Sequence, residues 1–113
     1  MTAGAAKEGM MYSSITTIRV QPDQLDRAAR AWQELHAAGR SPDGLQRAHF
    51  LVDRATGQVV IVGLWDTEQE ARAFEQSDQV RQVREALRPF LAPGAGAADR
   101  RTYEVAASVG RGG

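Results

Sequence analysis

The chain has 113 residues, of which 42% are hydrophobic and 25% are charged, and its 14 basic and 14 acidic side chains give a formal net charge of zero. This composition predicts one folded domain with a modest core and excludes a disordered chain. Because the charge is balanced, neither nucleic acid nor anionic lipid is expected as a partner. The absence of cysteine excludes disulfides, thiolate metal sites and a cysteine nucleophile.

Neither a targeting signal nor a membrane span is expected. No apolar run approaches the roughly 20 residues that a membrane span needs. Residues 1–9 contain a single lysine and no apolar region of the kind found in secretory signals. Together with the absence of cysteine, this pattern predicts a cytoplasmic protein. We expect flexible tails at 1–9 and 110–113 around one domain at 10–109.

The first predicted elements are a strand and an amphipathic helix. Met10 to Val20 is rich in β-branched residues and is expected to be a strand. Pro22 suits the first turn of the helix, and Gly39 is expected to end it. Between them, residues at i, i+3 and i+4 spacing form one apolar stripe: Leu25, Ala28, Ala29, Trp32, Leu35 and His36.

A hairpin of two strands is expected next, with strands at 45–53 and 58–65 and a short turn between them. The second of these strands is apolar on both faces, because Ile61 and Trp65 alternate with Val62 and Leu64. Such a strand must be covered on both faces. In a chain of this length, helices supply one cover, and another subunit is expected to supply the other.

Two helical segments and a last strand complete the expected order. Thr67 and Glu70 have the spacing of a capping box, and Ser77 is expected to cap a further segment that Pro89 bends or ends. The last strand is expected at 102–109. The order β-α-β-β-α-β predicts an α+β, ferredoxin-like fold with both helices on one face of a four-stranded antiparallel sheet. Two bare sheet faces packed together would form a homodimer.

Four local patterns make the chain resemble the antibiotic biosynthesis monooxygenase (ABM) family of dimeric α/β-barrel proteins. They are the strand-to-helix junction at 20–25, the glycine before the second strand at 43–45, the segment Leu64-Trp65-Asp66-Thr67-Glu68 and the helix end at 73–78. The resemblance covers residues 12–109 and implies a dimeric α/β barrel. Activities in the family include cofactor-independent oxygenation of polycyclic phenols, quinol oxygenation and haem degradation, and many members have no known activity.

The chain departs from the haem-degrading branch of this family. That branch has Asn on the first strand, Trp in the second main helix and His in the segment after it. The corresponding positions here are Thr16 or Thr17, Phe74 and about Arg84. The two histidines of the chain also have no acidic partner at ligand spacing. We therefore expect neither a metal nor another cofactor, and haem degradation is the least supported activity.

Three residues are candidates for catalysis: His49, Thr16 and Thr17. His49 lies on the second strand, and a histidine pKa near neutrality suits a general base. Thr16 and Thr17 are adjacent on a strand, so only one of them faces the helices, where it could orient a ligand or hold a water. The alternatives are a surface role for His49 and ordinary strand propensity for the two threonines. His36, at the end of its helix, is assigned no role.

Four aromatic residues are candidates to contact a substrate: Trp65, Trp32, Phe74 and Tyr103. Trp65 lies where the third strand meets a helix and could stack on a planar ring. The alternative is that Trp65 packs at this corner, that Trp32 belongs to the core and that Tyr103 lies in an interface. Gly63 marks either a bulge or a place where a missing side chain leaves room.

The favoured function is a cofactor-independent monooxygenase of the antibiotic-biosynthesis type, acting on a planar phenol or quinol. In such chemistry the substrate supplies the electrons as a carbanion or phenolate, and the protein supplies deprotonation, orientation and a dry pocket. The alternative is a non-catalytic dimer of the same fold that binds a small ligand or serves as an accessory protein. The small number of polar residues at the expected cavity positions favours this alternative.

Overall fold

The computed structural model describes residues 11–110. The expected tail at 1–9, the expected strand start at Met10 and all but the first residue of the expected tail at 110–113 therefore lie outside the described residues. The elements, in chain order, are β1 (Tyr12–Arg19), η1 (Pro22–Gln24), α2 (Leu25–Ala38), β2 (Leu45–Asp53), β3 (Gln58–Trp65), α3 (Glu68–Glu75), α4 (Asp78–Leu87), η2 (Arg88–Phe90) and β4 (Asp99–Glu104). This order confirms the predicted ferredoxin-like α+β fold.

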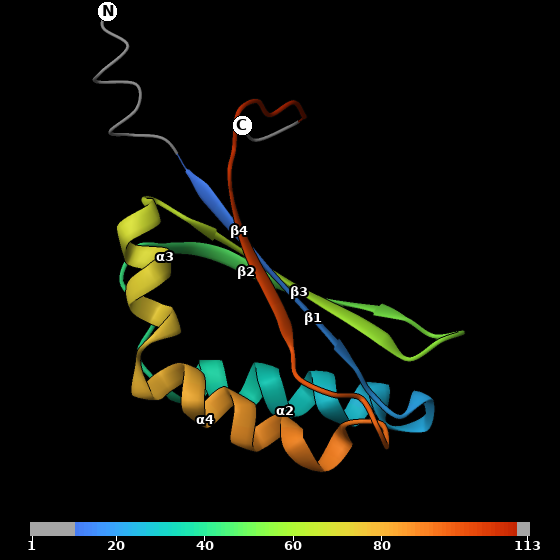
Figure 1. The fold of residues 1–113 in the computed structure, drawn as a ribbon. Helices are drawn as coiled ribbons and strands as arrows, with labels where there is room; N and C mark the ends of the chain where they lie inside the picture. Colours follow the sequence, from blue (N-terminus) through green and yellow to red (C-terminus); the bar gives the residue numbers. More distant parts are fainter. Residues whose placement is uncertain (1–10, 111–113) are drawn as a thin grey trace, which may run out of the picture.

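The four strands form one antiparallel sheet in the order β2-β3-β1-β4. Figure 1 shows α2 and α4 side by side on one face of this sheet, with α3 at one end. Within residues 11–110, no helix covers the opposite face, which we call the bare face. The fold therefore gives the two sheet faces different surroundings, as the sequence predicted.

The β2–β3 hairpin fixes the register of both strands. Gly57 has φ +82°, a left-handed conformation that favours glycine, and its N–H donates to the Asp53 carbonyl at 2.8 Å. The Asp53 side chain accepts from the Ala55 N–H at 3.0 Å. These bonds hold the turn so that Ala48, Phe50 and Val52 share the helix-covered face, which we call the inner face.

Side-chain caps begin the two helices that follow. Thr67 Oγ1 accepts from the Glu70 N–H, and Ser77 Oγ accepts from the Val80 N–H, both at 3.2 Å. α4 ends at Leu87, and Pro89 lies in the short η2 turn that follows. The Phe90 carbonyl then accepts from the Gln21 N–H at 2.9 Å. This bond fastens the end of α4 to the start of the η1–α2 segment.

The predicted position of the last strand is wrong. β4 spans Asp99–Glu104 rather than 102–109, and residues 105–109 adopt no strand. The reason is its partner: β4 pairs with β1, and their last pair joins Glu104 to Tyr12, the first residue of β1. One further bond, from the Val105 N–H to the Met11 carbonyl, closes the ladder at 2.9 Å. The apolar alternation beyond it has no neighbouring strand among the described residues.

The hydrophobic core lies between the inner face and the helices α2 and α4. Its buried members are five residues, two of them on α2: Val20, Leu25, Ala28, Val59 and Leu87. A second buried group, which includes Trp65 and Ala71, lies near α3. None of the described helices is long and apolar enough to cross a membrane.

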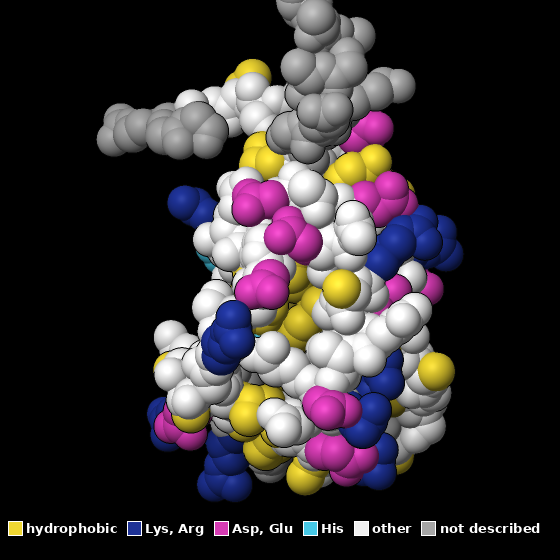
Figure 2. All heavy atoms as spheres, turned by 90° about the vertical axis from the view of Figure 1, so that its left-hand side faces the viewer, with side chains coloured by type: hydrophobic (Ala, Val, Ile, Leu, Met, Phe, Trp, Pro, Cys, Tyr) yellow, Lys and Arg dark blue, Asp and Glu magenta, His cyan; other side chains and the backbone are white. Residues whose placement is uncertain are grey.

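The end of the molecule that carries α3 bears side chains of both charge signs. Figure 2 shows acidic and basic side chains interspersed over this end, with hydrophobic side chains in a hollow between them. Several of the charges are paired locally, such as Arg72 with Glu68 and Arg81 with Asp78. Exposed pairs of this kind contribute little to stability, so what this end offers a ligand is the apolar hollow.

Candidate functional site

A cavity of about 690 Å³ lies between the inner face of the sheet and the helices α2 and α4. Its size falls within the range of small-molecule sites, which are mostly apolar with a few polar groups that fix the ligand. Apolar and polar side chains both line this cavity, and they come from the central strands β1 and β3, from β4 and from all three α-helices.

Two groups of aromatic side chains contribute to the lining of the cavity. Trp65 at the end of β3 packs against Phe74 of α3, with 5.2 Å between ring centroids and 40° between the ring planes. Trp32 of α2 packs against Phe50 at 5.5 Å and edge-on against His36 at 4.9 Å. A planar ligand in the cavity could therefore contact aromatic ring faces or edges.

A buried hydrogen bond orients the Trp65 indole. Its Nε1–H donates to Ser14 Oγ at 3.0 Å, and Ser14 is only 4% exposed. Gly63 makes this bond possible, because a Cβ there would lie 2.9 Å from Ser14 Oγ and 3.0 Å from Trp65 Nε1. The glycine therefore leaves room beside Trp65, one of the two roles expected for it.

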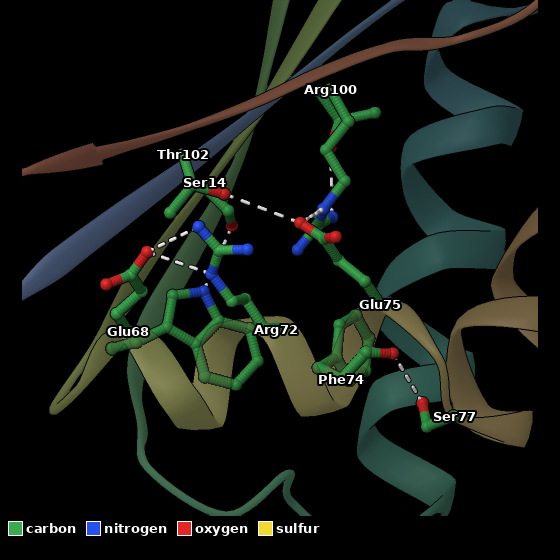
Figure 3. A network of polar contacts seen from close by, with 10 residues as sticks. Ser14, Glu68, Arg72, Phe74, Glu75, Ser77, Arg100 and Thr102 are labelled. Atoms are coloured by element: carbon green, nitrogen blue, oxygen red, sulfur yellow. Dashed lines mark hydrogen bonds and ion pairs between the residues drawn. The ribbon is translucent and has the colours of Figure 1, made fainter.

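A second polar group surrounds Arg100 of β4, as Figure 3 shows. Arg100 Nε donates to Glu75 Oε2 of α3 at 2.7 Å, and Arg100 Nη1 donates to Thr16 Oγ1 at 3.2 Å. Thr102 Oγ1 also donates to Glu75 Oε2, at 3.4 Å. The Arg100 guanidinium carbon lies 5.9 Å from the centre of the Phe74 ring, a cation–π distance. This cluster ties β4 to α3 and forms the polar wall of the cavity.

The charge of Arg100 is largely removed from water, since its side chain is 19% exposed. Glu75 offsets the cost of that desolvation. Within the described chain, the buried Nη2 atom has no hydrogen-bond partner. The guanidinium therefore keeps unused donor capacity beside the cavity.

His36 is the titratable aromatic group of the cavity. Burial lowers its pKa below the ordinary histidine value, so the neutral imidazole predominates at neutral pH. A neutral imidazole can accept a proton. The described residues contain no cluster of three or more His, Asp or Glu side chains able to hold a metal ion.

The structure brings four of the seven predicted site residues together. Trp65, Trp32, Phe74 and Thr16 all line the cavity. Thr17 borders it as well, but strand alternation turns the side chain of Thr17 to the bare face.

The other two predicted site residues lie elsewhere. His49 is exposed on the bare face of β2, opposite Val62, and Tyr103 is 49% exposed on the same face of β4. Neither side chain lines the cavity, because strand alternation turns both residues to the face away from the helices. The structure therefore separates His49 from the aromatic residues that were expected to act with it.

Sequence reasoning missed three cavity residues: His36, Ser14 and Arg100. The apolar stripe of the helix did include His36, and that periodicity was the signal that it faces inward. Ser14 shares its face with Thr16, so the same strand alternation places both hydroxyls on the inner face. No sequence pattern indicated that Arg100 lies at the cavity, because the last strand was expected to begin only at residue 102.

These features define a class of protein: a ferredoxin-like α+β domain with an aromatic-lined cavity between its sheet and its helices. Residues 11–86 match the family model described as antibiotic biosynthesis monooxygenase. The chain therefore belongs to the antibiotic biosynthesis monooxygenase family, as its local patterns implied. No curated protein matches the chain significantly.

Solved structures show the same fold at low sequence identity. Among them are two that carry the name putative antibiotic biosynthesis monooxygenase. The one from Nitrosomonas europaea is 18% identical, with 90% of this chain and 96% of that chain covered and a TM-score of 0.69. The one from Chloroflexus aurantiacus is 21% identical, with 90% and 99% covered and a TM-score of 0.64. SnoaB from Streptomyces nogalater, described as a cofactor-independent oxygenase, is 13% identical, with 88% and 96% covered and a TM-score of 0.63.

Proposed function

We propose that this chain is a cofactor-independent monooxygenase that acts on a planar phenol or quinol bound in the cavity between the sheet and the helices. The observation that carries the proposal is the pairing of aromatic walls, Trp65 with Phe74 and Trp32 with His36, around a space of about 690 Å³. The description of the structural neighbour SnoaB as a cofactor-independent oxygenase supports it.

The chemistry needs a base, an aromatic clamp and molecular oxygen. On a substrate of the anthrone type, the base removes one proton from the ring CH₂ group, and the resulting carbanion donates its electrons to O₂. A C–O bond forms, and the second C–H proton then leaves as the O–O bond breaks. The CH₂ group becomes C=O, O₂ is reduced, and one oxygen atom leaves as water. The protein's contribution is orientation, deprotonation and exclusion of water.

His36 is the base that we assign, in place of His49. It lines the cavity beside Trp32, and burial favours its neutral, proton-accepting form by lowering its pKa. His49 was the sequence-based choice, but it lies on the exposed bare face. The imidazole of His36 and the aromatic clamp therefore act on the same space.

A homodimer through the bare faces belongs to this proposal. Ile15, Val62 and Leu64 lie on that face of the two central strands, and Leu51 is 50% exposed beside them. Burying these side chains against a second copy would remove them from water. Such a dimer would place the two cavities on the outer sides of the paired sheets.

One observation favours a second function, a non-catalytic ligand-binding or accessory dimer. Polar groups of the cavity already bond to one another: Trp65 bonds to Ser14, and Arg100 bonds to both Glu75 and Thr16. A site whose polar groups are internally paired can hold a ligand without acting on it.

Oxygen uptake separates the two functions. The assay uses anthrone or a quinol, with a chelator present and no added flavin, against the buffer rate of oxidation. We expect uptake by the wild type, and a His36→Gln variant slowed by about 100-fold or more if His36 is the general base. His49→Gln makes the same change on the opposite face and should keep the wild-type rate. If the wild type consumes no oxygen while the phenol still quenches tryptophan fluorescence, the binding function replaces the enzyme.

A further inference from the structure

We infer that residues 95–98, which we call the entrance segment, form the doorway of the cavity, and that their small side chains set how fast a planar ligand enters and leaves. The inference rests on the proposed function only for the class of ligand, a planar aromatic molecule. It adds the route by which that ligand reaches the cavity and the part of the chain that selects ligands by width.

The pairing between β1 and the chain that leads into β4 is interrupted beside the cavity. The Ala92 N–H donates to the Arg19 carbonyl at 3.0 Å, and pairing resumes where Asp99 lies opposite Thr17. Between these two contacts β1 has a single residue, whereas the other side of the ladder has residues 93–98. The extra residues therefore loop out from the edge of the sheet. Figure 1 shows this loop, in orange, between the end of η2 and the start of β4.

The residues of the loop explain why the chain leaves the sheet here. Pro93 has no backbone N–H for the ladder. Gly94 has φ +72°, and the Ala95 N–H donates to the Ala92 carbonyl at 3.0 Å, which is the pattern of a type II turn with proline and glycine at its centre. Gly96 has φ +76°, a second left-handed position that interrupts a strand. The loop is therefore formed by its own sequence rather than by contacts with the helices.

The exposed part of the cavity lining gathers around the entrance segment. Residues 95–98 all line the cavity, and residues 96–98 are also exposed. The other exposed lining residues lie next to this segment, at the paired ends of β1 and β3, or on α4 and η2: Asp99, Arg19, Gln58, Arg84 and Arg88. By contrast, the lining near α3, which includes Trp65 and Phe74, is buried or half-buried. The cavity therefore meets solvent beside the entrance segment.

No large side chain of the entrance segment narrows this opening. Residues 95–98 carry at most a methyl group as side chain. A Cβ built on either glycine of the loop would have no heavy atom within 4 Å, so these positions face open space. Two charged residues of the rim pair within their own segment of chain, Arg88 with Glu85. Asp99 likewise pairs with Arg101. Neither of these ion pairs spans the opening.

A doorway has a kinetic signature that separates it from a binding contact. A wider side chain in a doorway raises the barrier between the free and the bound ligand but leaves both end states unchanged. Association and dissociation then slow by the same factor, and the Kd stays constant. A residue that contacts the bound ligand changes the Kd instead, mostly through the dissociation rate.

The test attaches a bulky group to one position after the protein has folded. The chain has no cysteine, so Ala97→Cys introduces a unique thiol into the entrance segment. Benzyl methanethiosulfonate then adds an aromatic ring through a mixed disulfide, which dithiothreitol removes. Ala55→Cys is the matched control, because Ala55 is exposed in the β2–β3 turn and does not line the cavity.

Stopped-flow quenching of tryptophan fluorescence measures the exchange of two probes, 2-hydroxyanthraquinone with three fused rings and 4-nitrophenol with one ring. Neither probe requires an oxygenation step. The benzyl group at position 97 should slow association and dissociation of the anthraquinone by about tenfold each, with the Kd constant to within about twofold. The smaller nitrophenol should be slowed less. Dithiothreitol should restore the original rates, and the same label at position 55 should leave them unchanged.

The outcomes separate this inference from the proposed function. Unchanged exchange after labelling at position 97 would overturn the inference and point to entry through the hollow at the α3 end (Figure 2). A changed Kd with an unchanged association rate, or no saturable binding of either probe, would overturn it as well. Slowed exchange without oxygen uptake from anthrone would leave the doorway standing and remove only the monooxygenase. Oxygen uptake with unchanged exchange would remove only the doorway.

Discussion

The two faces of the sheet differ in the surroundings of their polar side chains. On the inner face, Ser14 bonds to Trp65 and Arg100 bonds to Glu75, because desolvated groups need partners. On the bare face, His49 is exposed and Tyr103 is 49% exposed. The proposed function therefore places chemistry on a small molecule at the inner face and association with a second copy at the bare face.

The first test of this comparison shortens the same type of side chain on the two sides of the sheet, in the core that covers the inner face and on the bare face. Leu25 is 1% exposed in the core, whereas Leu51 is 50% exposed on the bare face. Leu25→Ala should lower the free energy of unfolding by about 2–5 kcal/mol, because it removes buried methyl groups and leaves a cavity.

Leu51→Ala should cost under about 1 kcal/mol in dilute protein. Urea denaturation of both variants at one protein concentration measures the difference. Equal losses would show that the two faces are equally covered in solution.

The second test concerns association. Val62 lies at the middle of the bare face, between Ile15 and His49 on the neighbouring strands. If this face packs on a second copy, Val62→Asp would bury a carboxylate and weaken dimerisation by about 2–4 kcal/mol. Sedimentation equilibrium should then show the 12.3 kDa monomer where the wild type sediments at about twice that mass.

Val109→Asp is the matched control, since Val109 is fully exposed outside the sheet. It should leave the mass of the wild-type species unchanged. A wild type that remains monomeric at micromolar concentration would contradict the proposed dimer and leave the apolar bare face unexplained.

The sequence predicted these faces well, because alternation along a strand is a local property. β2 was predicted at 45–53 and spans Leu45–Asp53, with a glycine turn signal just after it. The caps at Thr67 and Ser77 were also predicted from short-range patterns and are confirmed. Each of these features depends on residues only a few positions apart.

The parts of the site that were missed depend on distant residues. Arg100 meets Glu75 and Thr16 only after β4 pairs with β1, and the expected start of that strand fell after it. The stripe that contains His36 was predicted, but its place at a cavity depends on how α4 packs beside α2. The fold could therefore be predicted from local sequence patterns. The polar wall could not, because its contacts join residues that are far apart in the sequence.

A third prediction concerns the hydrogen bond at the inner face. Trp65→Phe keeps an aromatic ring but removes the donor to Ser14, which is buried. The free energy of unfolding should fall by about 1–3 kcal/mol. Weaker stacking on a substrate should cost a further 0.5–1.5 kcal/mol in the transition state, a rate effect of about 2- to 12-fold.

A double-mutant cycle with Ser14→Ala checks this account of Trp65. The two changes remove the two ends of one bond, so together they should cost less than the sum of their separate effects, by about 0.5 kcal/mol or more. Strict additivity would mean that the indole N–H and the serine hydroxyl do not interact in solution.

The smallest expected effect is the dependence of stability on pH that arises from His36 of α2. Burial lowers the pKa of His36 in the folded state below the unfolded value near 6.5, so in the window just below 6.5 the unfolded chain binds more protons. The contribution of His36 to stability should therefore be fully present above that value and should decline as the pH falls from 7 to 5.5. Asp26, whose pKa is lowered by the Arg54 side chain, titrates only at more acidic pH and does not enter this window.

Urea midpoints at pH 7.5 and 5.5 measure the decline in stability. The variant His36→Gln should show a smaller decline, whereas His49→Gln, on the bare face, should decline as the wild type does. Equal declines in both variants would show that His36 is not the source of this pH dependence.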